Sequence, residues 1–292
     1  MKNNNLDVCK KTRKVAADSL YQTLQKVLNS NNPISELEFR DSWLISLRKH
    51  QEIFPDGWYL PPPHGMGVLF ATDKDSKRVK FKTLRAKEYW SRKDVFLDRD
   101  NGFVLFYCSP VDKESFIIGD FGLNIYFGKN VKIQEALMKH LALTQKVFEF
   151  ANIGTSLLEL NNFAANLFKQ NGFINNWWIS TTDPTGTNYG HTIPGIENPW
   201  IDSELEILKG NGAWETKIKV INKKRKFVNS AENALIKPGM ALTVEPRMIQ
   251  DGDPAFPNIY FHTIAIFKEN GEKEWLTDFD SIFKLSGMSY LL

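Results

Sequence analysis

The segment TNYGHTIPG, residues 187–195, places a histidine between two glycines and a proline. Residues of these types favour loop or strand-edge geometry. On its own, His191 is explained equally well by hydrogen bonding within a loop. An imidazole becomes a metal ligand or a proton carrier near neutral pH when carboxylates accompany it, so acidic residues elsewhere in the chain decide its role.

Two acidic residues stand in strand-like sequence of high apolar content. Glu245 lies in LTVEPR (242–247), where polar and apolar residues alternate, and Asp120 ends the apolar run of IIGDFG (117–122). A carboxylate that faces the interior is costly unless it is paired or binds a cation. Asp120, His191 and Glu245 are therefore three candidate ligands of one shared pocket.

The elements that must position these residues follow from hydrophobic periodicity. Four segments show helical spacing, and Ser35 with Glu38 forms a capping pattern at the start of one of them. Strand-like runs and turns fill most of the rest. The pattern predicts an α+β protein with helices over one face of a largely antiparallel sheet. We expect helices at 6–29, 35–54, 132–151 and 156–173, and strands at 66–72, 102–110, 115–128, 214–229, 240–247, 257–268 and 273–276.

Composition narrows the class of protein. The 292 residues are 42% hydrophobic and 24% charged, which is typical of a globular protein with a sizeable core. A net charge of +3 argues against a nucleic-acid partner. Cys9 and Cys108 are far apart in the sequence and read as reduced thiols. No signal-peptide core and no membrane span is evident, so we expect a cytoplasmic protein without a membrane partner.

Four motifs carry a resemblance to a known family. GHTIPG, KPGMALTVEPR, FHTIAIFKENGEKEWLT and GDFGLNIYFGKN resemble motifs of the methionine aminopeptidase / aminopeptidase P / prolidase / creatinase superfamily and cover nearly the whole chain. The resemblance implies the pita-bread fold, a curved, mostly antiparallel sheet covered by two helix pairs. It further implies a single catalytic-type domain over 1–292, without the separate N-terminal domain of the prolidase branch.

The family's peptidases usually hold two divalent metals with ligands in the order Asp, Asp, His, Glu, Glu. The resemblance carries the second Asp to Asp120, the His to His191 and the first Glu to Glu245. Ser109 stands in place of the first Asp, and Phe261 in place of the last Glu. This incomplete ligand set implies at most one divalent metal (Zn, Mn or Fe(II)). The alternative is a metal-free pocket in which the Phe261 ring fills the volume of the lost carboxylate.

Further site residues also follow from the resemblance. His64 is similar to a histidine that contacts substrate in metal-dependent members and is the general base in the creatinase branch. Ser109 and Phe261 are expected to contact substrate. Arg247 is expected either to bind a substrate carboxylate or to pair with an acid of the pocket. His262 is expected to point to the opposite sheet face from Phe261.

Two functions remain open on this basis. The first is a hydrolase, related to Xaa-Pro aminopeptidases and creatinase, that cleaves an amide or amidine C–N bond of a small peptide or amino-acid-derived substrate. Glu245 or His64 would move protons. The alternative is a non-catalytic pita-bread protein that binds through its pocket or surface. Trp177, Trp178 and the loop 180–188 are expected near the pocket mouth, and creatinase-like relatives imply a homodimer.

Overall fold

A computed structural model of the chain describes residues 5–81, 83–175, 189–253 and 256–292. Trp177, Trp178 and the loop 180–188 lie outside the described residues. The described helices are α1 (Asn5–Leu28), α2 (Glu36–Leu47), α3 (Val131–Phe150), α4 (Leu157–Gln170), α5 (Asp202–Lys209), α6 (Trp214–Lys223) and α7 (Asp280–Leu285). The strands are β1 (Met66–Thr72), β2 (Gly102–Cys108), β3 (Phe121–Tyr126), β4 (Phe173–Asn175), β5 (Met240–Val244), β6 (Arg247–Gln250), β7 (Ile259–Phe267) and β8 (Lys273–Leu276).

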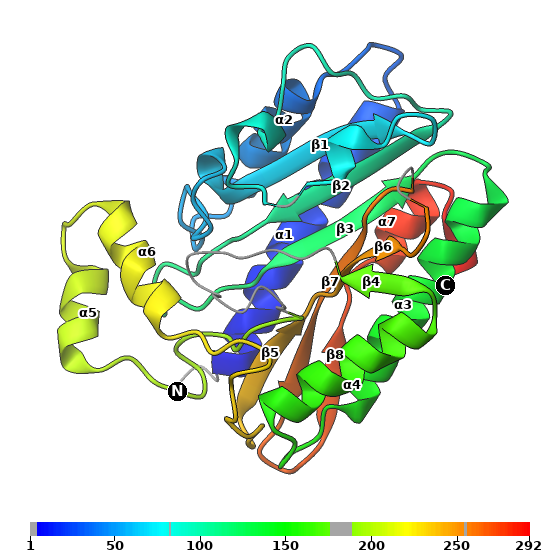
Figure 1. The fold of residues 1–292 in the computed structure, drawn as a ribbon. Coiled ribbons are helices and arrows are strands. Elements are labelled where there is room, and N and C mark those ends of the chain that lie inside the picture. Colours follow the sequence, from blue (N-terminus) through cyan, green and yellow to red (C-terminus); the bar gives the residue numbers. More distant parts are fainter. Residues whose placement is uncertain (1–4, 82, 176–188, 254–255) are drawn as a thin grey trace.

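One antiparallel sheet organises these strands. Its order is β1-β2-β3-β7-β6-β4, and β5 and β8 also pair with β7 (Figure 1). The central strand β7 is long enough to pair with different neighbours along its length. The register Gly122↔His262 joins β3 to β7. This pairing brings the start of β3, and therefore Asp120, next to the middle of β7.

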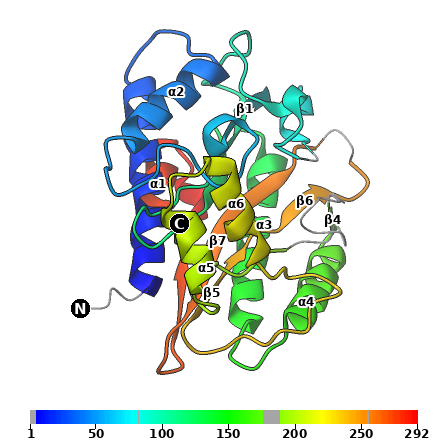
Figure 2. The same ribbon diagram turned by 90° about the vertical axis from the view of Figure 1, so that its left-hand side faces the viewer.

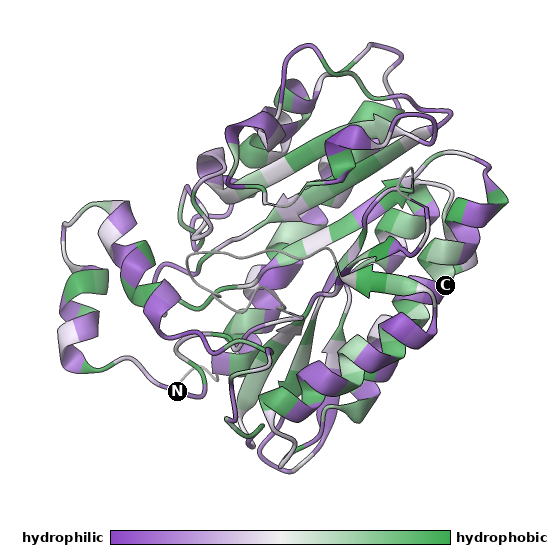
Figure 3. Ribbon diagram, in the orientation of Figure 1, coloured by the Kyte–Doolittle hydropathy of each residue, from purple (hydrophilic) through white to green (hydrophobic). Residues whose placement is uncertain are grey.

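Helices cover one face of the sheet. α2 begins with the predicted capping box, in which Ser35 Oγ accepts from the Glu38 N–H and the Glu38 carboxylate accepts from the Ser35 N–H. The α1–α2 pair packs on the β1–β3 side, and α3 packs against β7 and β5. The strands at the centre are mostly hydrophobic, while hydrophilic residues are frequent along the helices (Figure 3). Among the described helices, none is long and apolar enough to cross a membrane.

The predicted α+β architecture is confirmed, and one predicted element is wrong. The expected strand at 214–229 is largely helix α6. Trp214, Ile218 and Ile221 follow one another at spacings of four and three residues, which places them on one helix face. The short helices α5 and α7 were not predicted. Together α5 and α6 form an arm that stands beside the sheet (Figures 1 and 2).

Candidate active site

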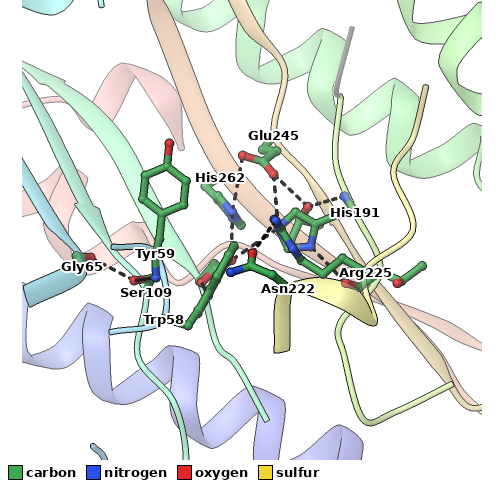
Figure 4. Close-up of polar contacts among 12 residues, drawn as sticks. Trp58, Tyr59, Gly65, Ser109, His191, Asn222, Arg225, Glu245 and His262 are labelled. Carbon is green, nitrogen blue, oxygen red and sulfur yellow. Dashed lines mark hydrogen bonds and ion pairs between the residues drawn. The ribbon is translucent and has the colours of Figure 1, made fainter. Parts of the chain in front are cut away.

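Asp120, His191 and Glu245 converge in one buried place, as the sequence predicts. His191 Nε2 lies 3.5 Å from Asp120 Oδ2 and 3.6 Å from Glu245 Oε1. The Asp120 side chain is fully buried, and the Glu245 side chain is 11% exposed. Asp120 directly precedes β3 and Glu245 directly follows β5, while the imidazole comes from the chain before α5. Figure 4 shows Glu245 and His191 facing each other. Three distant segments thus meet at the face of the sheet that the helices leave uncovered.

His191 is positioned by the strand that precedes Glu245. The Thr243 N–H donates to the His191 carbonyl at 2.8 Å, and the Glu245 N–H donates to the Tyr189 carbonyl at 2.8 Å. A Cβ at Gly190 would lie 1.9 Å from the Thr243 carbonyl oxygen, so only glycine allows this approach. The segment around His191 therefore behaves as an extra strand beside β5.

The protonation of His191 follows from its neighbours. Nδ1 lies 3.0 Å from the Thr192 carbonyl oxygen, which can only accept a hydrogen bond. Nδ1 therefore carries a proton. In the neutral imidazole, Nε2 then presents a lone pair to two carboxylates, which is favourable only with a cation or a second proton between them. A backbone carbonyl that orients one ring nitrogen is also the usual arrangement for a metal-binding histidine.

The two carboxylates are held by different donors. Trp58 Nε1–H donates to Asp120 Oδ1 at 2.6 Å, and Asp120 Oδ2 has no hydrogen-bond partner among the described residues. Thr243 Oγ1 donates to Glu245 Oε1 at 3.1 Å, and the Tyr260 hydroxyl donates to Oε2 at 3.3 Å. Burial raises the pKa of Tyr260 well above its ordinary value, so the hydroxyl keeps its proton. Glu245 is fixed, whereas one oxygen of Asp120 stays open toward His191.

The sheet corrects the predicted roles of two neighbours on β7. Phe261 packs against the rings of His140 at 5.7 Å, Phe279 at 5.9 Å and Phe283 at 6.0 Å, so it faces the helices and does not fill the pocket. His262 does point to the opposite face, as alternation requires, but that face is the site. Its Nε2 lies 3.7 Å from Glu245 Oε2. The alternation of side chains along a strand correctly predicts that Phe261 and His262 point to opposite faces. It does not say which face contains the candidate site.

His262 supports the carboxylates as a neutral imidazole. Burial lowers the pKa of His262 well below its ordinary value. Its Nδ1 is buried and has no hydrogen-bond partner among the described residues, and Nε2 lies 3.9 Å from Asp120 Oδ2. A proton on Nε2 points toward both carboxylates, whereas a proton on Nδ1 would be an unpaired buried donor. The Nε2–H tautomer is therefore favoured, and His262 is a donor beside the set of three.

Two arginines that the sequence did not point to, the fully buried Arg13 and the half-buried Arg225, offset the negative charge. Arg13 of α1 donates to the carbonyl oxygens of Asp120 at 2.5 Å and His262 at 2.8 Å, so it clamps β3 to β7. Arg225 lies with its guanidinium 4.4 Å from the Trp58 ring. Burial lowers the pKa of Arg225 to about 10, and the nearby Asp120 partly offsets that effect. Arg225 thus remains a cation at neutral pH.

Ser109 plays a structural role, which corrects the expectation that it contacts substrate. Its fully buried hydroxyl accepts from the Tyr59 N–H at 3.1 Å and donates to the Gly65 carbonyl at 3.0 Å. Gly57 and Gly65 both approach so closely that a Cβ at either position would lie within 2.5 Å of Ser109 Oγ. Ser109 therefore ties down the segment that carries Trp58.

The remaining predicted residues lie nearer the surface. His64 Nδ1 is 2.6 Å from Asp56 Oδ1 and 3.4 Å from the Arg48 guanidinium, and its side chain is 34% exposed. The Arg247 side chain forms no hydrogen bond or ion pair within the part of the chain that is described, and its backbone belongs to the β6–β7 ladder. Burial is the main cause that lowers the pKa of His262, and the charge of Arg247 adds to it. The expected ion pair of Arg247 with Glu245 or Asp120 is therefore not formed.

Neither thiol is arranged for nucleophilic chemistry. Cys9 and Cys108 are buried and free. Burial raises the pKa of Cys9 to about 12 and also raises the pKa of Cys108. A thiolate is the reactive form, so both cysteines serve as packing residues.

Three side chains of the pocket have the chemistry of metal ligands. Within the described ranges, no group of three or more His, Cys, Asp or Glu side chains is arranged so that it could hold a metal ion as it stands. Two ligands about 2.1 Å from a tetrahedral Zn lie about 3.4 Å apart, close to the 3.5 and 3.6 Å that separate His191 Nε2 from the carboxylates. The open Asp120 Oδ2 and the oriented His191 have the chemistry that such an ion requires. Ser109 and Phe261 supply nothing to a second one.

Comparisons with known proteins agree with this architecture. No protein-family model and no curated protein matches the sequence. The solved structure of the X-Pro aminopeptidase from Thermotoga maritima matches with a TM-score of 0.61 and 12% identity over 95% of this chain and 62% of that one. The Xaa-Pro dipeptidase from Bacillus anthracis matches with a TM-score of 0.61 and 13% identity over 95% and 61%. The His361Ala aminopeptidase P of Escherichia coli matches with a TM-score of 0.60 and 12% identity over 99% and 59%.

The fold is therefore established as the pita-bread fold. By its fold and its site, the chain is a pita-bread protein with two carboxylates and two imidazoles in its pocket. The chain spans 59–62% of the length of these three structures. At such low identity the likeness concerns the fold, and the chemistry must be argued from the residues of this chain.

Proposed function

We propose that the chain is a hydrolase that cleaves an amide or amidine C–N bond of a small peptide or amino-acid-like substrate, with at most one divalent metal. One observation carries this proposal. His191 presents Nε2 to Asp120 and Glu245 at 3.5 and 3.6 Å while its Nδ1 is tied to a carbonyl. A neutral imidazole would turn its Nε2 lone pair toward two negative groups, so this placement calls for a cation or a second proton between them.

The residues of the pocket have separate tasks. Asp120, His191 and Glu245 would hold one cation, which when bound polarises a carbonyl and lowers the pKa of water. Glu245 would also be the better placed proton acceptor, because its side chain is 11% exposed whereas that of Asp120 is fully buried, and because it lies beside His191. His64 is less suited to this task, since Asp56 already engages its Nδ1.

Substrate orientation would fall to groups around this centre. Tyr260 and Thr243 hold Glu245 in one orientation, so its proton acceptance is directional. Arg247 is partly buried and without an ion-pair partner among the described residues, and it can take a substrate carboxylate.

Metal content and turnover test the proposal together. The protein would be purified, freed of metal and titrated with Zn, Mn or Fe(II), beside the Asp120→Asn variant. Hydrolysis of Xaa-Pro dipeptides, peptides with N-terminal Met and guanidino compounds would then be measured. We expect one equivalent of metal, turnover of one substrate class, and loss of both in the variant.

A non-catalytic binding protein is the second candidate, and one observation favours it. The positions of two family ligands serve packing here, since Ser109 secures a loop and Phe261 faces the helices. No turnover across the whole panel, with or without added metal, would favour this candidate. Metal bound without turnover would leave the pocket as a binding site only.

A further inference from the structure

A basic cleft of about 610 Å³ opens beside the candidate active site. It lies between helix α6 and the segment that runs from residue 60 to residue 85. Its charged lining is one acid, Glu215, and four cations: Arg85, Lys219, Lys223 and Arg225. The chain as a whole has a net charge of only +3, so this concentration of positive charge is local.

None of the four cations has a carboxylate in direct contact among the described residues, whereas the neighbouring Lys224 pairs with Glu204 at 2.7 Å. Asp120 and Glu245 act on Arg225, and Glu204 acts on Lys223, only at longer range. After burial, the charge of Arg85 is among the causes that lower the pKa of Arg225, so the two guanidinium groups repel each other. Like charges gathered in one cleft raise the local concentration of anions.

Both arginines are held in place by aromatic rings. Arg85 stacks 4.2 Å from the centre of the Tyr59 ring and donates to the Leu60 carbonyl. Arg225 lies 4.4 Å from the Trp58 ring and donates to Asn222 Oδ1 at 2.7 Å (Figure 4). A guanidinium held in one orientation loses little entropy when it binds a planar carboxylate.

Arg225 also has binding capacity left. Its Nε is buried and has no hydrogen-bond partner among the described residues. A buried donor without a partner is costly, and a ligand oxygen in the cleft would remove that cost. The same Arg225 lies against Trp58, whose indole N–H donates to Asp120. A ligand bound in the cleft is therefore one side chain away from the candidate active site.

We propose that this cleft binds the carboxylate side chains of an acidic peptide, and so selects substrates that carry Glu or Asp next to the cleaved bond. The selection of substrates rests on the proposed function, but the binding of anions in the cleft does not. It depends only on Arg85, Lys219, Lys223 and Arg225. An inactive protein would retain it.

The test measures binding and not turnover. The whole chain would be titrated by calorimetry with N-acetyl-Glu-Glu-amide and, as the neutral match, N-acetyl-Gln-Gln-amide. Lys219→Gln/Lys223→Gln removes two cations of the cleft. Lys146→Gln/Lys209→Gln removes the same charge from exposed positions of α3 and α5 and is the control. Circular dichroism would establish that both variants keep the fold.

We expect the acidic peptide to bind the unaltered protein, and the cleft variant to weaken it at least about tenfold while the control stays within about twofold. The affinity for the neutral peptide should be the same in the unaltered protein, the cleft variant and the control. Equal weakening by the cleft variant and the control would overturn the proposal, because the effect would then come from net charge. Equal affinity for the two peptides would overturn it as well.

A third titration separates carboxylates from phosphate. If inorganic phosphate bound more tightly than the acidic peptide, with the same loss in the cleft variant, the cleft would be a phosphate site and the assignment to acidic peptides would be wrong. Binding of the acidic peptide without any peptide hydrolysis would contradict the hydrolase proposal alone. The two proposals therefore fail on different observations.

Discussion

The hydrogen bond from Trp58 to Asp120 makes a quantitative prediction. Trp58→Phe keeps an aromatic ring but removes the 2.6 Å bond to a buried carboxylate, and the other oxygen of Asp120 has no partner among the described residues. A hydrogen bond to a charged group contributes about 1.5–3 kcal/mol. The free energy of unfolding should therefore fall by about 2 kcal/mol beyond the loss of ring volume, which is about 30-fold in the unfolding equilibrium.

Trp43→Phe is the matched control. Trp43 is also fully buried, but its Nε1–H reaches the uncharged Ala16 carbonyl at the long distance of 3.4 Å. Both variants lose the same ring volume, so the difference between them reports mainly the bond to Asp120, together with any change in the contact of the Trp58 ring with Arg225. With a urea dependence of about 3 kcal/mol per M, the midpoints should differ by about 0.7 M.

Urea unfolding followed by far-UV circular dichroism measures this difference. Saturating Zn or Mn should reduce it, because a cation that binds the folded protein stabilises it and compensates Asp120. If Trp58→Phe lost no more stability than Trp43→Phe, Asp120 would not depend on the indole, and the electrostatic account of the pocket would be refuted.

Three further predictions concern other residues. Asp120→Asn should weaken metal binding at least about 100-fold with the fold retained, as measured by competition with a chromophoric chelator; unchanged affinity would remove Asp120 from the ligand set. Arg247→Gln should raise KM for substrates with a free carboxylate about tenfold and leave their amides unaffected, and equal effects on both would exclude carboxylate recognition. Burial lowers the pKa of His140 from 6.5 to about 3. Below pH 6.5 the unfolded chain binds a proton that the folded chain does not bind. The free energy of unfolding therefore decreases as the pH is lowered from 6.5 toward 3. His140→Leu should remove about 2.3 kcal/mol of the loss between pH 6.5 and 4.5, measured by urea unfolding; identical pH profiles would show that His140 does not carry it.

Much of the fold was predictable because its long elements have strong periodicity. Hydrophobic spacing predicts the central strands and the helices near 6–29, 132–151 and 156–173. The apolar residues that give this spacing are the ones that the fold buries. Helix α6 was mistaken for strand because basic residues interrupt its short apolar stripe. The helical spacing of Trp214, Ile218 and Ile221 was the available signal.

The site was predictable in its acids and in His191, because inward-facing carboxylates within apolar runs are rare. His262 was missed because the resemblance suggested that Phe261 faces the pocket. Period-two alternation separates two faces and cannot say which of them meets Asp120. Arg13 and Arg225 were missed because their partners lie far away in the sequence, as in the 107-residue separation of Arg13 and Asp120. Only the folded arrangement reveals such contacts.

The extra strand beside β5 has a consequence for how this protein can vary. The Ile193 N–H donates to the Ala241 carbonyl at 2.9 Å, and the chain leaves the ladder after residue 193. It returns at residues 226–228, where the Thr192 N–H donates to the Lys226 carbonyl at 2.9 Å and the Val228 N–H donates to the Gly190 carbonyl at 2.8 Å. The segment between these points, which contains α5 and α6, therefore starts and finishes at one ladder. Its length and sequence can vary while the His191 imidazole and the Glu245 carboxylate keep their spacing. The three donors of the candidate site and the lysines of the basic cleft are thereby placed on separately evolvable parts of a single polypeptide.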